Sequence, residues 1–299
     1  TIIQSRQSKI ALNYYLLPSK KCVVSWTHKC ACTAISQWIK HSFDEGRDCP
    51  KEKSMRAYLI QAGLQYKSPN KLNSLTIGEQ PSVNKIIISY RDPASRITST
   101  FVNKFHVYEN RTIFDGRKKI QGFSKKFSTD ISKNLNRNQD TCEGHGDFSL
   151  REMVLFLWEL NRKGSIRAVD PHFKPQLLDK KQLDSIKSYS NQNVRLFPLK
   201  VECLRSDLAS INDELNFNYF PPYINSTSLP TEDWSFSNSA ELVDLPLSKL
   251  YANKVIPKSD SLRKALKQDK EFNKKYMDIF ENDYELLRWM DGLRTKEIT

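Results

Sequence analysis

Three short apolar runs rich in β-branched residues stand apart along the chain, and each is followed by a segment with helical periodicity. The runs are Cys22–Thr27, Lys85–Tyr90 and Val194–Leu199. Runs of this length and composition are typical of strands that are buried on both faces of a sheet. Since strands that alternate with helices build parallel sheets, the pattern predicts an α/β fold with a central, mainly parallel sheet flanked by helices.

Apolar residues recur every three or four positions after each run, as expected for one face of a helix. The three stripes are Ile35, Trp38 and Ile39; Ile97, Phe101 and Phe105; and Leu204, Leu208, Ile211 and Leu215. The second helix has a clear start, because Asp92 is a good N-cap residue and Pro93 suits the first helical position.

Two more helices are predicted from end signals and periodicity. Ser149 and Glu152 form a capping box, and Gly164 marks the end of a helix that begins at Leu150. A terminal helix near residues 267–290 carries an apolar stripe, so we expect it to pack back on the sheet.

The chain of 299 residues contains no internal repeat and only nine glycines, which argues against long flexible linkers. We therefore predict a single domain over residues 1–299. The stretch from about 106 to 147 is basic and polar with little periodicity. It is interpreted as a surface insertion in that domain.

The charge balance indicates an anionic partner. Lysine and arginine total 47 against 34 acidic residues, a net charge of +13. Nucleic acid, acidic polysaccharide, an anionic membrane surface and a phosphorylated ligand all remain open on this ground. The longest apolar run, Met153–Trp158, is far shorter than the roughly 20 residues that span a bilayer, so no transmembrane segment is expected.

The loop His28–Thr33 lies between the first predicted strand and its helix. At such a position the unpaired amides and the helix dipole favour an anion. Lys29 supplies a cation and Thr33 a hydroxyl. The glycines of the nucleoside-triphosphate motif GxxxxGK[ST] are absent, and the lysine precedes the small residues, so a different phosphate chemistry is indicated.

At four places in the same order the chain resembles the Golgi-type carbohydrate sulfotransferases, the family 2 group that includes the chondroitin 4-O-sulfotransferases. The matching segments are Lys29–Thr33 (Lys-x-Gly/Ala-Cys-Thr), Arg91–Ser99 (Arg-Asp-Pro-x-x-Arg-x-x-Ser), Val169–Gln176 (Asp-Pro-His-Trp-x-Pro-Gln) and Leu199–Leu204 (Gly-Lys-x-Glu-x-Leu). Asn103–Phe105 extends the second match, and Asp283–Leu287 adds a weaker one near the end. The resemblance covers roughly two thirds of the chain.

Four positions depart from the family pattern. Ala31 and Leu199 replace glycine, His28 stands where proline is common, and Phe173 replaces tryptophan. None of these changes removes a charged group that, in the resembling family, would bind the sulfate donor. The stretch from His106 to Asp147 has no counterpart in the family, which leaves the acceptor open.

The resemblance implies a P-loop-like sulfotransferase fold and transfer of a sulfuryl group from 3′-phosphoadenosine 5′-phosphosulfate (PAPS) to a hydroxyl, most simply of a carbohydrate. The product of the donor would be adenosine 3′,5′-bisphosphate, and no metal is needed. Lys29 would neutralise charge on the bridging oxygen. The donor's 5′-phosphate would be bound by Lys29, Cys30, Ala31, Cys32, Thr33 and Ala34. Arg91 and Ser99 would bind its 3′-phosphate.

A hydroxyl nucleophile needs a general base, and histidine has a suitable pKa. His172, in the Asp-Pro-His element, is the first candidate, and the alternative is that it structures its turn by hydrogen bonding. His106 is the second candidate. Residues 142–147 include possible metal ligands, but zinc needs four and no second cluster is visible, so we expect no metal.

Two other functions remain open from the sequence. A basic nucleic-acid-binding protein would bind in a strongly salt-dependent way and independently of Lys29. A nucleotide-dependent kinase of the P-loop type would require Mg²⁺. Localisation is also open: eukaryotic family members are anchored in the Golgi, whereas a microbial enzyme would be cytoplasmic.

Overall fold

The structure is a computed structural model that describes residues 13–43, 65–66, 83–108, 111–112, 122–135, 146–191, 194–222 and 229–297. The chain divides into two compact units. The first unit comprises Thr1–Arg91, Gln176–Ile224 and Asn282–Thr299, and the second comprises Asp92–Pro175 and Asn225–Glu281. Because the chain passes between the units four times, neither unit is a continuous piece of sequence. Whether the 299 residues fold as a single domain stays a prediction.

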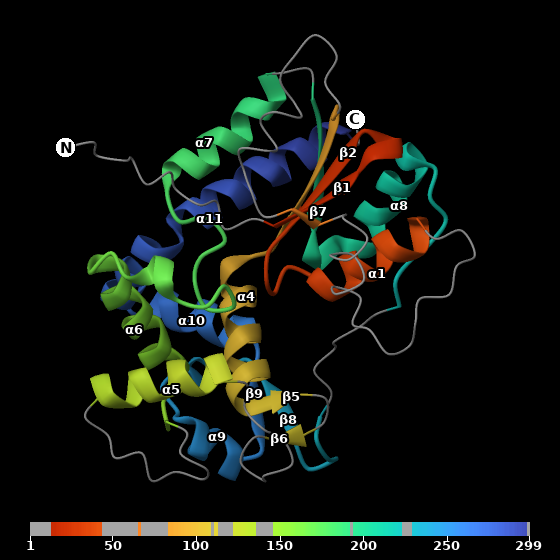
Figure 1. Ribbon diagram of the computed structural model, residues 1–299. Coiled ribbons are helices and arrows are strands. Elements are labelled where there is room, and N and C mark those ends of the chain that lie inside the picture. The colour runs from red at the N-terminus through yellow and green to blue at the C-terminus, as the bar shows by residue number, and fades with distance from the viewer. Residues whose placement is uncertain are drawn as a thin grey trace, which may run out of the picture. The chain divides into compact units, whose positions relative to one another are not determined.

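The first unit contains a five-stranded sheet in the order β3-β1-β2-β4-β7 (Figure 1). Its strands are β1 (Asn13–Leu17), β2 (Cys22–Trp26), β3 (Gln65–Tyr66), β4 (Lys85–Tyr90) and β7 (Arg195–Lys200). The three predicted strands, β2, β4 and β7, pair in parallel. The sheet as a whole is mixed rather than mainly parallel, because β1 pairs antiparallel with both β2 and β3.

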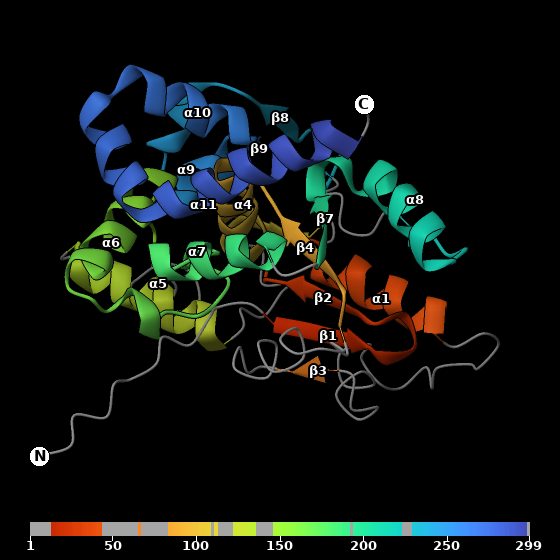
Figure 2. The same ribbon diagram turned by 90° about the horizontal axis from the view of Figure 1, so that it is seen from above.

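Helices cover both faces of this sheet, as the predicted α/β fold requires (Figures 1 and 2). The helices are α1 (Cys32–Phe43), α7 (Lys180–Ser188), α8 (Leu204–Leu215) and the end of α11 (Lys270–Glu297). Alternate strand residues face opposite sides. Ile86 and Leu196 pack with Leu286 of α11 and Leu183 of α7. On the other face, Ile87 and Phe197 pack with residues of α1 and α8.

Short helical turns complete the first unit. They are η1 (Pro18–Lys20), η5 (Tyr189–Asn191) and η6 (Val201–Cys203). The turn η1 lies between β1 and β2, whose register pairs Leu17 with Cys22. Strand β1 was not predicted, since its sequence Asn-Tyr-Tyr-Leu-Leu lacks β-branched residues.

The second unit is mainly helical, with two small two-stranded sheets. Its longer helices are α4 (Pro93–Phe101), α5 (Gly122–Asn134), α6 (Leu150–Arg162), α9 (Leu247–Ala252), α10 (Ser259–Gln268) and the start of α11. Its strands are β5 (Val107–Tyr108), β6 (Arg111–Thr112), β8 (Ser235–Ser237) and β9 (Val255–Pro257). The short turns are η2 (Val102–His106), η4 (Ile166–Ala168) and η7 (Ala240–Val243).

The helix ends that the sequence predicts are present in this unit. The Asp92 side chain accepts a hydrogen bond from the Ser95 amide and caps α4, with Pro93 as the first helical residue. Ser149 and Glu152 form the complete capping box of α6. Gly164, just beyond that helix, has a φ of +67°, a conformation that glycine adopts without strain.

Helix α5 corrects the interpretation of residues 106–147 as a surface insertion. Phe127 and Ile131 on this helix are buried, and the Phe127 ring stacks on Phe173 with ring centroids 4.1 Å apart. Phe105 stacks on Phe173 as well, at 5.5 Å. The spacing of Phe123, Phe127 and Ile131 is helical and could have revealed this element. Part of the stretch therefore belongs to the core of the second unit.

Among the described residues, no helix has both the length and the apolar character that crossing a bilayer requires.

Candidate anion-binding site

The predicted loop occupies the connection between β2 and α1 in the first unit, and we call residues 28–33 the anion loop. A tight turn begins it, with the Cys30 amide donating to the Thr27 carbonyl at 3.2 Å. The first helical bond runs from the Ile35 amide to the Ala31 carbonyl at 2.9 Å. The amides of residues 32–34 precede that bond and belong to the first helical turn, where helices bind anions.

The backbone of the anion loop has an uncommon conformation. Lys29 has a φ of +66° and Ala31 a φ of +54°, whereas Cys30 between them does not have a positive φ. Alternating φ signs turn successive amides toward the same side and form concave anion sites. For residues with a Cβ, the left-handed conformation costs about 1–2 kcal/mol. Glycine at position 31 would adopt this conformation without that cost.

Arg91 lies next to this loop. Its Nη1 donates to the Lys29 carbonyl at 3.1 Å, and its Nε is 3.7 Å from Glu202 Oε1. Lys29, Arg91 and Glu202 follow β2, β4 and β7, three neighbouring parallel strands. Their shared edge is where open α/β sheets bind ligands. Arg91 therefore pairs with an acid and at the same time contacts the anion loop.

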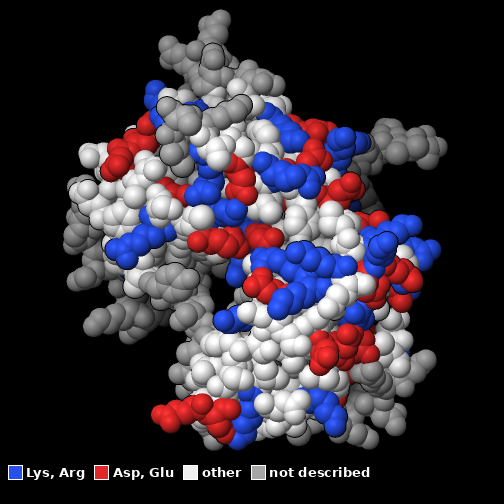
Figure 3. Space-filling model, turned by 180° about the vertical axis from the view of Figure 1, so that it is seen from behind, with Lys and Arg blue, Asp and Glu red and all other residues white. Residues whose placement is uncertain are grey.

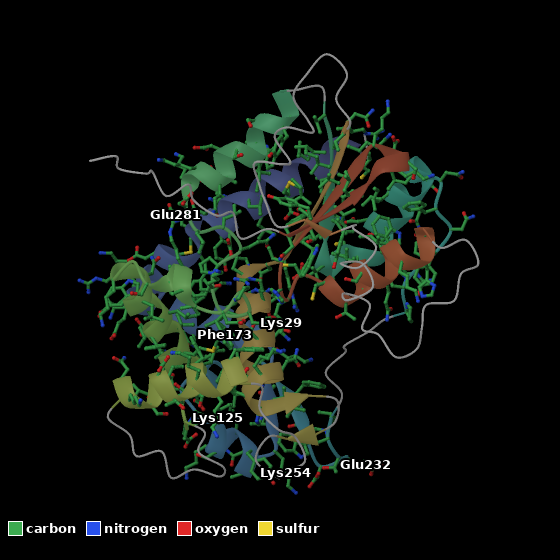
Figure 4. All side chains as sticks on the ribbon, viewed as in Figure 1. Lys29, Lys125, Phe173, Glu232, Lys254 and Glu281 are labelled. Carbon is green, nitrogen blue, oxygen red and sulfur yellow. The ribbon has the colours of Figure 1, made fainter. Side chains whose placement is uncertain are left out.

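The side chains of the anion loop differ in exposure. Cys30 is fully buried and its Sγ donates to Gln176 Oε1 at 3.4 Å, while Thr33 is exposed at the start of α1. Figure 4 shows Lys29 at the end of the strands, where β2 passes into α1. The hydroxyl of Thr27, the residue before the loop, is buried with no hydrogen-bond partner among the described residues. Such a donor is suited to an anionic oxygen.

A second charged group lies at the end of β7. Lys200 Nζ is 2.7 Å from Asp291 Oδ2, and the Tyr90 hydroxyl donates to Asp291 Oδ1 at 2.8 Å. Arg294 Nη2 donates to Asp207 at 2.8 Å. Burial, and then the hydrogen bond to Asp291, hold the pKa of Tyr90 well above its usual value. These contacts attach α11 to the sheet edge. The sequence predicted that this helix packs on the sheet, but not these polar contacts.

Ser99 and Arg96 lie on α4, in the second unit. Ser99 Oγ accepts from Asn103 Nδ2 at 3.2 Å and is half-buried. Arg96 is 2% exposed and donates to the Lys174 carbonyl, which is a structural contact. The structure thus assigns Arg96 a packing role and leaves Ser99 on the surface of its helix.

His172, in the second unit, forms a close pair with Asp170. Its Nδ1 is 2.5 Å from Asp170 Oδ1, and the same oxygen accepts from the His172 amide at 2.9 Å. The imidazole stacks on Phe123 of α5, with ring centroids 4.8 Å apart and planes at 6°. An ionised Asp170 keeps the proton on Nδ1, so that Nε2 is the nitrogen that can accept one. The sequence identified His172 but neither Asp170 nor Phe123 as its partners.

His106 lies in a different environment. It is fully buried, and its Nε2 is 2.9 Å from the Val255 carbonyl. Burial lowers its pKa to about 4, with the hydrogen bond to Val255 acting in the opposite direction. The ring is neutral at pH 7 and enclosed by protein, so its position does not favour the role of a base for an acceptor hydroxyl.

The described residues contain no group of three or more metal-ligating side chains. Cys142, Glu143 and His145, which the sequence raised as possible ligands, lie outside the described residues. The four described cysteines, at positions 22, 30, 32 and 203, are free thiols.

Comparisons of this chain with protein-family models, with curated proteins and with solved structures give no match, so the site is interpreted from its own residues.

Proposed function

We propose that the protein is a sulfotransferase that moves the sulfuryl group of PAPS to an acceptor hydroxyl. The observation that carries this proposal is the contact between the two segments that resemble donor-binding motifs. They lie 62 positions apart in the sequence, and the Arg91 guanidinium meets the Lys29 carbonyl at 3.1 Å. A nucleotide with two phosphate groups needs two such cationic positions near each other.

The anion loop offers the groups that a 5′-phosphosulfate requires. The amides of Cys32, Thr33 and Ala34 are suited to bind the 5′-phosphate, and the Lys29 ammonium would stabilise negative charge on the oxygen that bridges phosphorus and sulfur. Arg91 presents a guanidinium fork that suits the 3′-phosphate. The 3.7 Å approach of Glu202 orients this fork while leaving the pair partly exposed.

His172 is proposed as the general base. In the transfer the bond between sulfur and the bridging oxygen breaks, and a bond forms between sulfur and the acceptor oxygen. The acceptor proton passes to His172 Nε2, and adenosine 3′,5′-bisphosphate leaves with the bridging oxygen. The 2.5 Å contact with Asp170 supports this role, because a carboxylate on Nδ1 stabilises the imidazolium that forms. His106 is the weaker candidate because it is fully buried.

Surface charge gives limited support to a nucleic-acid-binding protein. Figure 3 shows basic side chains interspersed with acidic ones on the face it presents. Several exposed lysines form ion pairs with neighbouring acids, including Lys126 with Asp130 and Lys163 with Glu159. Nucleic acid favours an extended basic stripe instead.

The test is binding of adenosine 3′,5′-bisphosphate by calorimetry in the presence of EDTA, followed by transfer of labelled sulfate to saccharides, small alcohols and phenols. We expect metal-independent binding that is lost in Lys29→Ala, and labelling of a carbohydrate. Binding that requires Mg²⁺ and ATP would favour the kinase. Binding only to nucleic acid, with a steep salt dependence, would favour a nucleic-acid-binding protein.

A further inference from the structure

A buried chain of hydrogen bonds joins the anion loop to the end of β4. Gln176 is 2% exposed, its Nε2 donates to the Ser89 carbonyl at 2.7 Å, and its Oε1 accepts from the Cys30 thiol at 3.4 Å. Ser89 lies two positions before Arg91, and Cys30 follows Lys29. The hydrogen bond from Arg91 Nη1 to the Lys29 carbonyl is a second, direct connection between the loop and the end of β4. The loop and Arg91 are therefore connected twice, once directly and once through Gln176.

Asp283 of α11 holds Gln176 itself in place. The carboxylate is 4% exposed and accepts from two successive amides, that of Gln176 at 2.8 Å and that of Leu177 at 2.7 Å. Buried carboxylates are stable only when donors of this kind satisfy their oxygens. These two bonds fix the backbone from which the Gln176 side chain projects.

A glutamine amide suits this position because it donates and accepts at the same time. The bond to the Ser89 carbonyl is short, whereas a thiol is a weak donor. Replacement by methionine would fill nearly the same volume but would leave the Ser89 carbonyl without this donor and the Cys30 thiol without this acceptor. Such a change alters hydrogen bonding with little change in packing.

We propose that Gln176 is a positioning residue that sets the separation between the anion loop and Arg91, and that Asp283 acts through Gln176. The inference rests on the proposed function, because it supposes a ligand that places one phosphate on the loop and another on Arg91. A ligand with two phosphates at a fixed separation is sensitive to this spacing. A ligand with one phosphate is not.

The experiment compares adenosine 3′,5′-bisphosphate with adenosine 5′-phosphate as calorimetric ligands of the wild-type chain and of Gln176→Met. We expect the variant to lose about tenfold in affinity for the bisphosphate and less than about threefold for the monophosphate. Asp283→Asn should show the same preference with a smaller loss, because the asparagine side chain keeps one acceptor oxygen.

Gln182→Met is the matched control. Gln182 is 1% exposed, and its Oε1 accepts from the Leu178 amide at 2.8 Å rather than from the loop. This variant should lose stability without changing the ratio of the two affinities. Equal losses for both ligands in Gln176→Met, or the same ratio change in Gln182→Met, would overturn the proposal.

Misfolding of the variant, failure of the proposed function and failure of this inference alone give different results. If Gln176→Met does not fold, as judged by circular dichroism, Gln176→Glu is measured instead, since it keeps an acceptor for Cys30 and loses the donor to Ser89. If the wild-type chain binds neither nucleotide, the proposed function fails and the inference fails with it. If the wild type binds both while the variants keep its affinity ratio, only the inference fails.

Discussion

The anion loop of the first unit is shaped by backbone torsions, whereas the Asp170–His172 pair of the second unit is shaped by side-chain contacts. Lys29 and Ala31 have left-handed φ values, and these torsions set the direction in which the loop amides point. His172 instead depends on a carboxylate at 2.5 Å and on the stacked ring of Phe123. Substitutions should therefore have different effects in the two places. In the anion loop they should change backbone strain and charge, and at the Asp170–His172 pair they should change the proposed proton transfer.

The largest expected effect is at the side-chain pair. His172→Ala should lower the rate of sulfate transfer by about 10²- to 10⁴-fold, because the acceptor would lose the general base proposed for it. Affinity for adenosine 3′,5′-bisphosphate should change by less than about twofold. Steady-state transfer and calorimetry measure the two quantities. His41→Ala, an exposed position of α1, is the control, and full turnover in His172→Ala would exclude its role.

The next effect separates charge from torsion in the loop. Lys29→Ala and Lys29→Gly both remove the cation, so both should lower the transfer rate by about 10²- to 10³-fold. The glycine variant should be the more stable one, because it adopts the φ of +66° without strain. Transfer assays and thermal unfolding distinguish the two contributions. Lys125→Ala, exposed on α5, should retain activity, and a slow Lys125 variant would contradict the assignment.

His106 gives a prediction of pH dependence. Its pKa is lowered to about 4, so the folded state favours the neutral ring, and stability is lost as the pH falls below the unfolded value of about 6.5. Between pH 7 and pH 4 the wild-type chain should lose about 3 kcal/mol of unfolding free energy relative to His106→Gln. Denaturant titration at both pH values measures this difference. Parallel pH profiles of the two proteins would contradict it.

The smallest effect tests the loop torsion alone. Ala31→Gly should raise the free energy of unfolding by about 1 kcal/mol, because glycine relieves the left-handed strain at φ +54°. Ala209→Gly, in the middle of α8, should lower it by about 1 kcal/mol. Urea denaturation of both variants measures the contrast, and equal destabilisation would show that Ala31 is unstrained.

Local patterns predicted much of this structure. The runs at Cys22 and Lys85, the cap at Asp92 and the capping box at Ser149 all specify conformation through neighbouring residues, and the structure confirms them. Strand β1 and helix α5 were missed or misinterpreted. Tyrosine and leucine are not specific to strands, and the apolar stripe of α5 is short within a polar stretch.

The candidate site likewise has a part that neighbouring residues specify and a part that depends on residues distant in the sequence. The anion loop could be placed from its strand, its lysine and its helix, all within a few residues. Its partners could not be predicted, since they lie far from the loop in the sequence. Glu202 contacts Arg91, and Gln176 accepts a hydrogen bond from Cys30. Gln176 ends one of the segments that resemble the family, but the sequence assigned it no role and did not indicate which atoms it contacts.

The long separation in sequence between β4 and the part of α11 that covers it has a consequence for biosynthesis. Leu286 and Met290 cover a face of the sheet that includes Ile86 and Ile88 of β4. At roughly 5–20 residues per second, about 10–40 s separate the synthesis of β4 from that of its cover. During this interval the apolar face of β4 remains without the cover that α11 provides. A chaperone that binds this face on the ribosome would therefore raise the yield of native protein.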